Sequence, residues 1–215
     1  MRRMRRWGVP LIVLLCALGV ALRHALRRRP VKAPFNPSKL YRVIGVRDGD
    51  TFTIDCGEEV RVVGVDTPEK GRPFSRRATN FARRTLLGRL VRIEPAKQPR
   101  DRFGRLLGWV WTENGKLFNE EVLRRGLGYL YLVEPNTKYR ERLLAAQREA
   151  RAKRRGLWRR PPKPEPYYVV AGNGASRTTH RPNCPRLKHL PNHKIYKSRD
   201  QALDTGAPPC RICNP

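Results

Sequence analysis

The feature that most constrains this chain is the segment of residues 48–69, which is typical of a β-hairpin with acidic side chains near its ends. The two predicted strands share alternating β-branched and aromatic residues, namely Phe52, Ile54, Val60, Val62 and Val65. Asp55-Cys56-Gly57 supplies the turn between the strands. The segment therefore predicts a small β structure that gathers carboxylates at one edge.

Three carboxylates are brought together by this hairpin. Asp50 lies near one end, and Asp66 and Glu69 follow the second strand. Such a group repels itself unless a cation lies among its members, and hard oxygen ligands on a flexible turn suit calcium better than a transition metal. Arg61, in the same hairpin, adds a planar guanidinium that can hold a phosphate oxygen.

A purely structural interpretation of the two acidic motifs stays open. Asp-Gly is a common turn dipeptide, and Asp-Thr-Pro-Glu at residues 66–69 can start a helix, with Pro in the first turn and Glu beside the helix dipole. A third motif, Asp101-Arg102-Phe103-Gly104-Arg105, follows later in the chain. The occurrence of all three in order favours a functional interpretation.

Together the motifs of residues 39–160 resemble the staphylococcal nuclease (thermonuclease) family, whose signature is DGDT, an Arg five residues before DTPE, and then DxYGR. Arg61 and Asp66 have that spacing here. The resemblance implies an α+β fold: a five-stranded OB-fold β-barrel with about three helices. It further implies a Ca²⁺-dependent endonuclease that hydrolyses phosphodiester bonds of DNA and RNA, leaves 3′-phosphates and uses no organic cofactor. We expect a monomer.

The resemblance also implies a role for each charged residue of the motifs. Ca²⁺ would be held by the carboxylates of Asp50 and Asp66 and the backbone carbonyl of Thr67, with Asp48 supporting these ligands from behind. Glu69 would orient or deprotonate the attacking water, and the sequence does not separate these two roles.

The resemblance also indicates four positions that would contact the phosphate and the bases of a nucleic acid. The resemblance implies that Arg61 and Arg105 clamp the phosphate and stabilise its transition state. Phe103 stands where the family has Tyr, so the phenolic hydroxyl is lost, and Tyr131 can stack on a base. Packing of Tyr131 in the barrel core is an open alternative. Asn119 matches a family Asn that we interpret as structural, buried and hydrogen-bonded.

The charge of the chain indicates a polyanionic partner. Lys and Arg number 47 against 18 Asp and Glu, a formal net charge of +29, which favours nucleic acid or an anionic membrane surface. A non-catalytic OB-fold protein that only binds nucleic acid, for example during DNA uptake, is therefore the alternative function. The acidic set argues against it, because a pure binder does not need clustered acids facing phosphates.

The N-terminus predicts a membrane segment. Residues 7–22 are an apolar run of 16 residues flanked by arginines, so residues 1–30 are interpreted as a signal anchor, followed by a linker over residues 31–39. The catalytic domain, residues 40–160, would then be anchored outside the cytoplasm, or secreted if the segment is cleaved. A buried N-terminal helix is the structural alternative.

A second module is predicted after the proline-rich linker of residues 161–166. Residues 167–215 contain one imidazole and three thiols at zinc-ligand spacing: His180, Cys184, Cys210 and Cys213. The module resembles the small metal-binding domain of the Ada DNA-repair protein, which also ends in Pro-Cys-x-x-Cys but uses four cysteines. A Cys210–Cys213 disulfide, or redox chemistry at Cys184, is the alternative to zinc.

Overall fold

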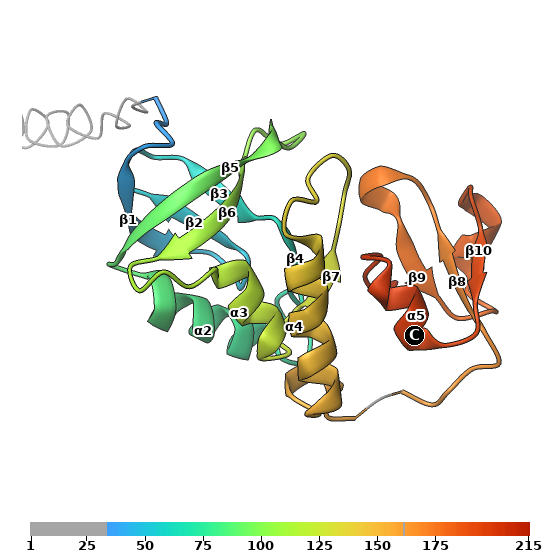
Figure 1. Cartoon of the computed structure of the whole chain (residues 1–215). Helices are drawn as coiled ribbons and strands as arrows, with labels where there is room; N and C mark the ends of the chain where they lie inside the picture. Colours follow the sequence, from blue (N-terminus) through green and yellow to red (C-terminus); the bar gives the residue numbers. More distant parts are fainter. Residues whose placement is uncertain (1–33, 161) are drawn as a thin grey trace, which may run out of the picture. The chain divides into compact units, whose positions relative to one another are not determined.

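The computed structural model describes residues 34–160 and 162–215. Five strands close into a barrel in the order β1-β2-β3-β6-β5 (Figure 1). Only β3 and β6 pair in parallel; the other barrel pairs are antiparallel. The barrel strands are β1 (Leu40–Val46), β2 (Thr51–Ile54), β3 (Glu59–Val62), β5 (Leu90–Arg100) and β6 (Leu106–Thr112). The predicted closed barrel is confirmed.

The barrel interior is filled by the side chains that alternate along its strands. Val43, Ile54, Val60 and Ile93 are fully buried, as expected for β-branched residues on the inner face of a pleated sheet. β5 extends to Arg100, because its pairing with β6 resumes beyond an irregularity after Pro95. The guanidinium of Arg100 binds both carboxylate oxygens of Glu58, which fixes that end of the strand.

Three helices pack beside the barrel: α2 (Ser75–Leu86), α3 (Phe118–Arg124) and α4 (Arg140–Ala152). α2 buries residues at four-residue spacing, Ala78, Ala82 and Leu86, and turns its arginines to solvent. α4 ends near Lys153, because Arg154 takes the left-handed conformation with φ 48°. The chain then continues into the short helix η1 (Gly156–Trp158).

The strand that follows the central hairpin leaves the barrel. Gly64 has φ 76°, a conformation that a residue with a side chain rarely adopts, and a Cβ there would lie 2.4 Å from Leu143 Cδ1. β4 (Gly64–Asp66) therefore pairs with β7 (Tyr129–Tyr131) outside the barrel, with Asp66 opposite Tyr129. The turn takes the chain out of the barrel, and Asp66 at the end of β4 still contacts Arg61 of β3.

The C-terminal module, residues 167–215, has its own three-stranded sheet, in the order β10-β8-β9. Its elements are β8 (Tyr168–Ala171), η2 (Gly174–Ser176), β9 (Thr178–His180), η3 (Pro185–His189), β10 (Lys194–Tyr196) and α5 (Arg199–Asp204). Tyr168, Val170, Ala202 and Ala207 form its small core. Residues Pro34–Pro215 constitute one compact unit, and the predicted division at residues 161–166 stays a prediction.

The predicted membrane anchor, residues 7–22, lies outside the described residues. Across residues 34–160 and 162–215, no helix has the length and apolar character needed to cross a bilayer.

The buried amide of Asn119 generates a prediction about stability. It accepts a hydrogen bond from the Val110 N–H (2.9 Å) and donates one to the Val63 carbonyl (2.7 Å). Asn119→Ala should lower the free energy of unfolding by about 2–4 kcal/mol, because two buried backbone groups lose their partner. Urea denaturation measures this change. Asn114→Ala, which removes an exposed amide, is the control, and an equally small effect of both variants would contradict the role of Asn119.

Candidate active site

Arg61 lies at the centre of the acidic cluster. It is carried by β3, its side chain is only 12% exposed, and it contacts two carboxylates from different segments. Its Nη1 is 3.2 Å from Asp50 Oδ1, and its Nη2 is 3.6 Å from Asp66 Oδ1. Burial opposes the charge of Arg61, but the carboxylates of Asp50 and Asp66 raise its pKa above the usual value. One guanidinium therefore joins the turn before β2 to the end of β4.

Asp50 is fixed by Thr67, which directly follows Asp66 in the chain. Its Oδ2 accepts hydrogen bonds from both the backbone N–H and the hydroxyl of Thr67, each at 2.7 Å. The carboxylate of Asp48 accepts a hydrogen bond from the Asp50 N–H (3.1 Å) and so shapes the turn behind it. The structure thus brings Asp48, Asp50, Asp66 and Thr67 together around Arg61, while their predicted roles stay predictions.

Asp66 has the most perturbed carboxyl of the cluster. Burial is the largest cause that raises its pKa, the Asp50 carboxylate adds to this effect and Arg61 opposes it, and the resulting pKa is about 6. An ionised Asp66 in this environment therefore needs positive charge beside it. Glu69 lies further out, with 58% of its side chain exposed.

The partner of Glu69 could not be predicted from the motifs. Arg211 Nη2 is 2.8 Å from Glu69 Oε1 and 3.6 Å from Asp66 Oδ1. Arg211 belongs to the C-terminal module, between two of the predicted zinc ligands. No spacing rule connects it with a carboxylate that lies far away in the sequence.

The third motif faces a cavity of about 430 Å³, which we call the aromatic cavity. Arg61, Arg105, Phe103 and Tyr131 line it. The Arg105 Nε donates to Asp101 Oδ2 (2.7 Å), and its guanidinium lies 5.4 Å from the ring centre of Phe103. Phe103 is 68% exposed. Both arginines that are predicted to bind the phosphate, Arg61 and Arg105, therefore line the aromatic cavity.

Tyr131 also lines the aromatic cavity and is only half-buried. Its hydroxyl donates to the backbone carbonyl of Ala175 (2.8 Å). Packing within the barrel core, the structural alternative for this residue, does not describe its position. Stacking on a base stays a prediction.

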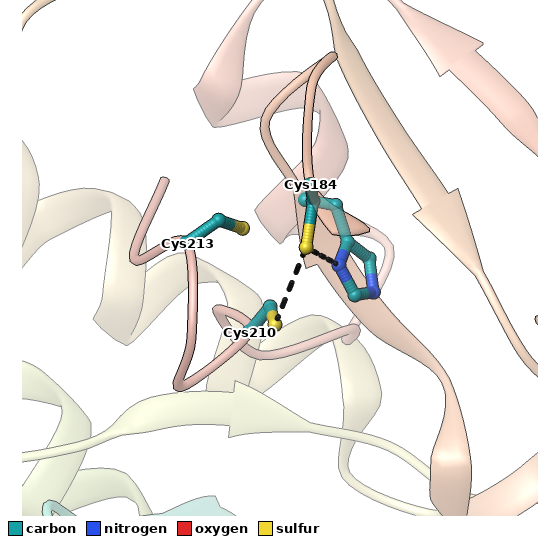
Figure 2. A group of neighbouring side chains, drawn as sticks. Cys184, Cys210 and Cys213 are labelled. Carbon is teal, nitrogen blue, oxygen red and sulfur yellow. Dashed lines mark hydrogen bonds between the residues drawn. The ribbon is translucent and has the colours of Figure 1, made fainter. Parts of the chain in front are cut away.

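A second cluster lies in the C-terminal module (Figure 2). One donor atom from each of His180, Cys184, Cys210 and Cys213 lies within 4.8 Å of all the others. The His180 Nδ1 is 3.2 Å from the Cys184 sulfur, which is 4.0 Å from that of Cys210. Figure 2 shows the three sulfurs gathered around one point. The three cysteines are free thiols, so no Cys210–Cys213 disulfide forms in this structure.

The protonation states of this cluster differ because the environments differ. Burial lowers the pKa of His180 to about 4, so its imidazole is neutral at pH 7. Burial raises the pKa of the Cys213 thiol to about 12. Burial acts on Cys210 in the same direction, but the backbone N–H groups of Cys213 and Ile212 outweigh it and lower the pKa of Cys210. A neutral imidazole beside three thiols is a donor set for a soft or borderline metal.

Comparison with known proteins identifies the family of the barrel domain. Residues 59–160 match the family model of the staphylococcal nuclease homologues. The thermonuclease of Staphylococcus hyicus is 38% identical over 127 residues, which cover 55% of this chain and 75% of the relative. The chain belongs to the staphylococcal nuclease family. The thermonuclease of Staphylococcus intermedius is likewise 38% identical, over 129 residues, with 56% and 76% coverage.

The family membership defines the class of enzyme. An uncharacterized endonuclease of Escherichia coli O157:H7 is 36% identical over 120 residues, which cover 54% of this chain and 75% of that protein. With the thermonuclease relatives, this makes the chain a nuclease, a hydrolase whose substrates are nucleic acids. The closed barrel fits the same family. The family match ends at residue 160 and does not include the Cys/His cluster.

The raised pKa of Asp66 generates a prediction about stability and pH. Between about pH 4 and pH 6 the folded state binds more protons at this carboxyl than the unfolded state, so its contribution to stability falls as pH rises through that window. In EGTA, the free energy of unfolding of Asp66→Asn should therefore rise by about 2–3 kcal/mol relative to that of the wild type between pH 4 and pH 7. Urea denaturation at four pH values measures the difference. A difference that does not change with pH would contradict the assignment.

Proposed function

We propose that this nuclease is a Ca²⁺-dependent endonuclease that cuts DNA and RNA at the Arg61 site. The observation that carries the proposal is the meeting of Asp50 and Asp66 at one buried guanidinium, beside a cavity that Arg105 also lines. The guanidinium that contacts both carboxylates is thus itself part of the cavity wall. This is the arrangement that phosphodiester hydrolysis requires.

The donors around Arg61 fit calcium. Asp50, Asp66 and the backbone carbonyl of Thr67 would hold the ion, since all three offer hard oxygen ligands. The high pKa of Asp66 supports this fit, because burial and the neighbouring carboxylate Asp50 leave its negative charge poorly compensated. When bound, the ion would polarise the phosphoryl group and lower the pKa of a coordinated water.

The chain's own side chains would do the remaining work. Arg61 and Arg105 border the aromatic cavity and would neutralise the charge that develops on the phosphoryl oxygens. Glu69 is exposed next to Asp66, where its carboxylate can orient a water or take its proton. Phe103 and Tyr131 offer ring faces to a nucleotide in the same cavity.

The Cys/His cluster supports a structural zinc site in the C-terminal module. One imidazole and three thiolates form a closed ligand set, which leaves no position for a substrate. The module has a core of only a few buried side chains, and a metal would supply stability that such a core cannot. The likeness of this module to the Ada metal-binding domain stays a prediction.

The cellular location is proposed from the sequence alone. The apolar residues 7–22 between arginines favour an anchor that holds a monomeric catalytic domain outside the cytoplasm, or a secreted enzyme if the segment is cleaved. Calcium is more abundant outside cells than inside, which agrees with a calcium-dependent site.

Digestion of DNA tests the enzymatic proposal. The wild type should cut single- and double-stranded DNA with Ca²⁺ and stop in EGTA, and Glu69→Gln should lose about 10²–10⁴-fold in rate. Glu141→Gln, which changes a carboxylate that is 84% exposed on α4, is the matched control and should keep its rate. DNA binding without Ca²⁺-dependent cutting by the wild type would favour the alternative of a non-catalytic binding protein.

Metal analysis tests the zinc proposal. The purified full chain should contain about one Zn²⁺, and Cys184→Ser should lose the metal and melt at a lower temperature, because the ligand set is then incomplete. Cys56→Ser, at the half-buried cysteine of the hairpin turn, should keep the zinc. Zinc-free protein with unchanged stability and a Cys210–Cys213 disulfide would contradict the proposal.

A further inference from the structure

Two cavities border the Arg61–Asp66 ion pair. The aromatic cavity includes Arg61. A second cavity of about 400 Å³, which we call the arginine cavity, includes Asp66 and Glu69. Four arginines also line it: Arg72, Arg160, Arg199 and Arg211. A strand whose scissile phosphate lies at Arg61 therefore has arginines beside it in both cavities.

The C-terminal module forms part of both cavities. Ala175 and Ser176 line the aromatic cavity, where the Ala175 carbonyl accepts the hydrogen bond from Tyr131. Cys210 and Arg211 line the arginine cavity. Residues beyond the family match, which ends at residue 160, therefore line both the aromatic cavity and the arginine cavity.

The module is fixed to the nuclease domain by a built interface. Leu203 of α5 packs with Ala150 of α4 in one apolar cluster. The carboxylate of Asp204 binds Arg151 (3.0 Å), and it also binds Arg148 (2.9 Å). The Leu132 N–H donates to the Gly206 carbonyl (2.9 Å), where a Cβ on Gly206 would lie 2.7 Å from the Leu132 Cβ. These contacts set where the 210–213 loop meets the active site.

Hydrogen bonds hold the backbone of the 210–213 loop, but the side chain of Arg211 is free to exchange partners. The Cys210 N–H donates to the Thr179 carbonyl (2.8 Å), and the Cys210 carbonyl accepts from the Asn214 N–H (2.9 Å). The Arg211 side chain is nevertheless 58% exposed, as is that of its partner Glu69. An ion pair this exposed contributes little to stability. It can therefore open when a phosphate approaches.

We propose that Arg211, with the exposed Arg72 and Arg160, forms a phosphate-binding subsite for the strand next to the scissile bond. Arg211 Nη2 lies 3.6 Å from the same Asp66 oxygen that Arg61 approaches to 3.6 Å, so two guanidiniums from different parts of the chain converge on one point of the site. A phosphodiester offers Arg211 a charge-assisted, bidentate partner in place of Glu69. The release also frees the Glu69 carboxylate. The inference rests on the nuclease activity, and not on its metal dependence.

The other three arginines of the arginine cavity differ in whether their side chains are already paired. Arg72 and Arg160 are exposed, and across residues 34–160 and 162–215 neither has an ion-pair partner. Arg199 is committed elsewhere, since its Nε donates to the Pro215 carbonyl and its guanidinium lies 5.3 Å from the ring centre of Trp158. The subsite therefore consists of Arg72, Arg160 and Arg211.

Binding of a fluorescent single-stranded oligonucleotide to the full-length, zinc-loaded chain in EGTA tests the subsite without cleavage. Arg211→Ala should weaken binding about tenfold at low salt and reduce the slope of log affinity against log salt by about 0.7, the value for one lost phosphate contact on a single strand. Arg211→Lys should recover part of the affinity. Lys197→Ala removes the same charge from an exposed position of the module that lines neither cavity, and should change both quantities far less.

Equal effects of Arg211→Ala and Lys197→Ala would overturn the subsite, since only general electrostatics would then remain. Unchanged oligonucleotide binding with tighter Ca²⁺ binding in Arg211→Ala would overturn it as well, by confining Arg211 to the carboxylates. Arg160→Ala provides a second variant, with the same expected loss of slope, if Arg211→Ala does not retain its zinc. A chain that binds as expected but cuts equally well in EGTA would refute only the calcium proposal.

Discussion

The buried ion pairs of Arg61 are the interactions on which the rest of the site depends. The guanidinium holds Asp50 at 3.2 Å and Asp66 at 3.6 Å, and these carboxylates come from segments that the hairpin and the Gly64 turn direct to one place. Breaking such a group by removing one partner leaves an uncompensated buried charge. The barrel therefore positions the site, and the site in turn imposes an electrostatic cost on the barrel that a bound cation would relieve.

The charge of the chain gains a more specific meaning from this arrangement. A net charge of +29 attracts any polyanion, but the sum does not say where a strand binds: α2, for example, turns its arginines to solvent away from the acidic cluster. Arg61 is different because it is buried against acids, and Arg211 because it reaches those acids from another module. The distribution of charge, and not its sum, distinguishes a site that can cut a strand from a surface that can only hold one.

Much of the nuclease domain could be predicted from local patterns. Alternating β-branched and aromatic residues predicted the strands of the central hairpin, and the resemblance carried by the ordered motifs predicted the closed barrel. Cys and His spacing predicted the cluster of the C-terminal module, whose donor atoms the structure brings together. The Arg211–Glu69 pair and the Tyr131–Ala175 hydrogen bond could not be predicted. Both depend on how one module docks on another, and docking is determined by surface complementarity that no local periodicity records.

The central claim is that Asp50 and Asp66 share one divalent cation beside Arg61. Isothermal titration of Ca²⁺ into the zinc-loaded chain, compared with Asp50→Asn, tests it most directly, because the measurement does not depend on catalysis. One calcium per chain in the wild type, and at least a tenfold loss of affinity in the variant, is the predicted result. Calcium binding that is absent from the wild type, or that Asp50→Asn leaves unchanged, would contradict the claim.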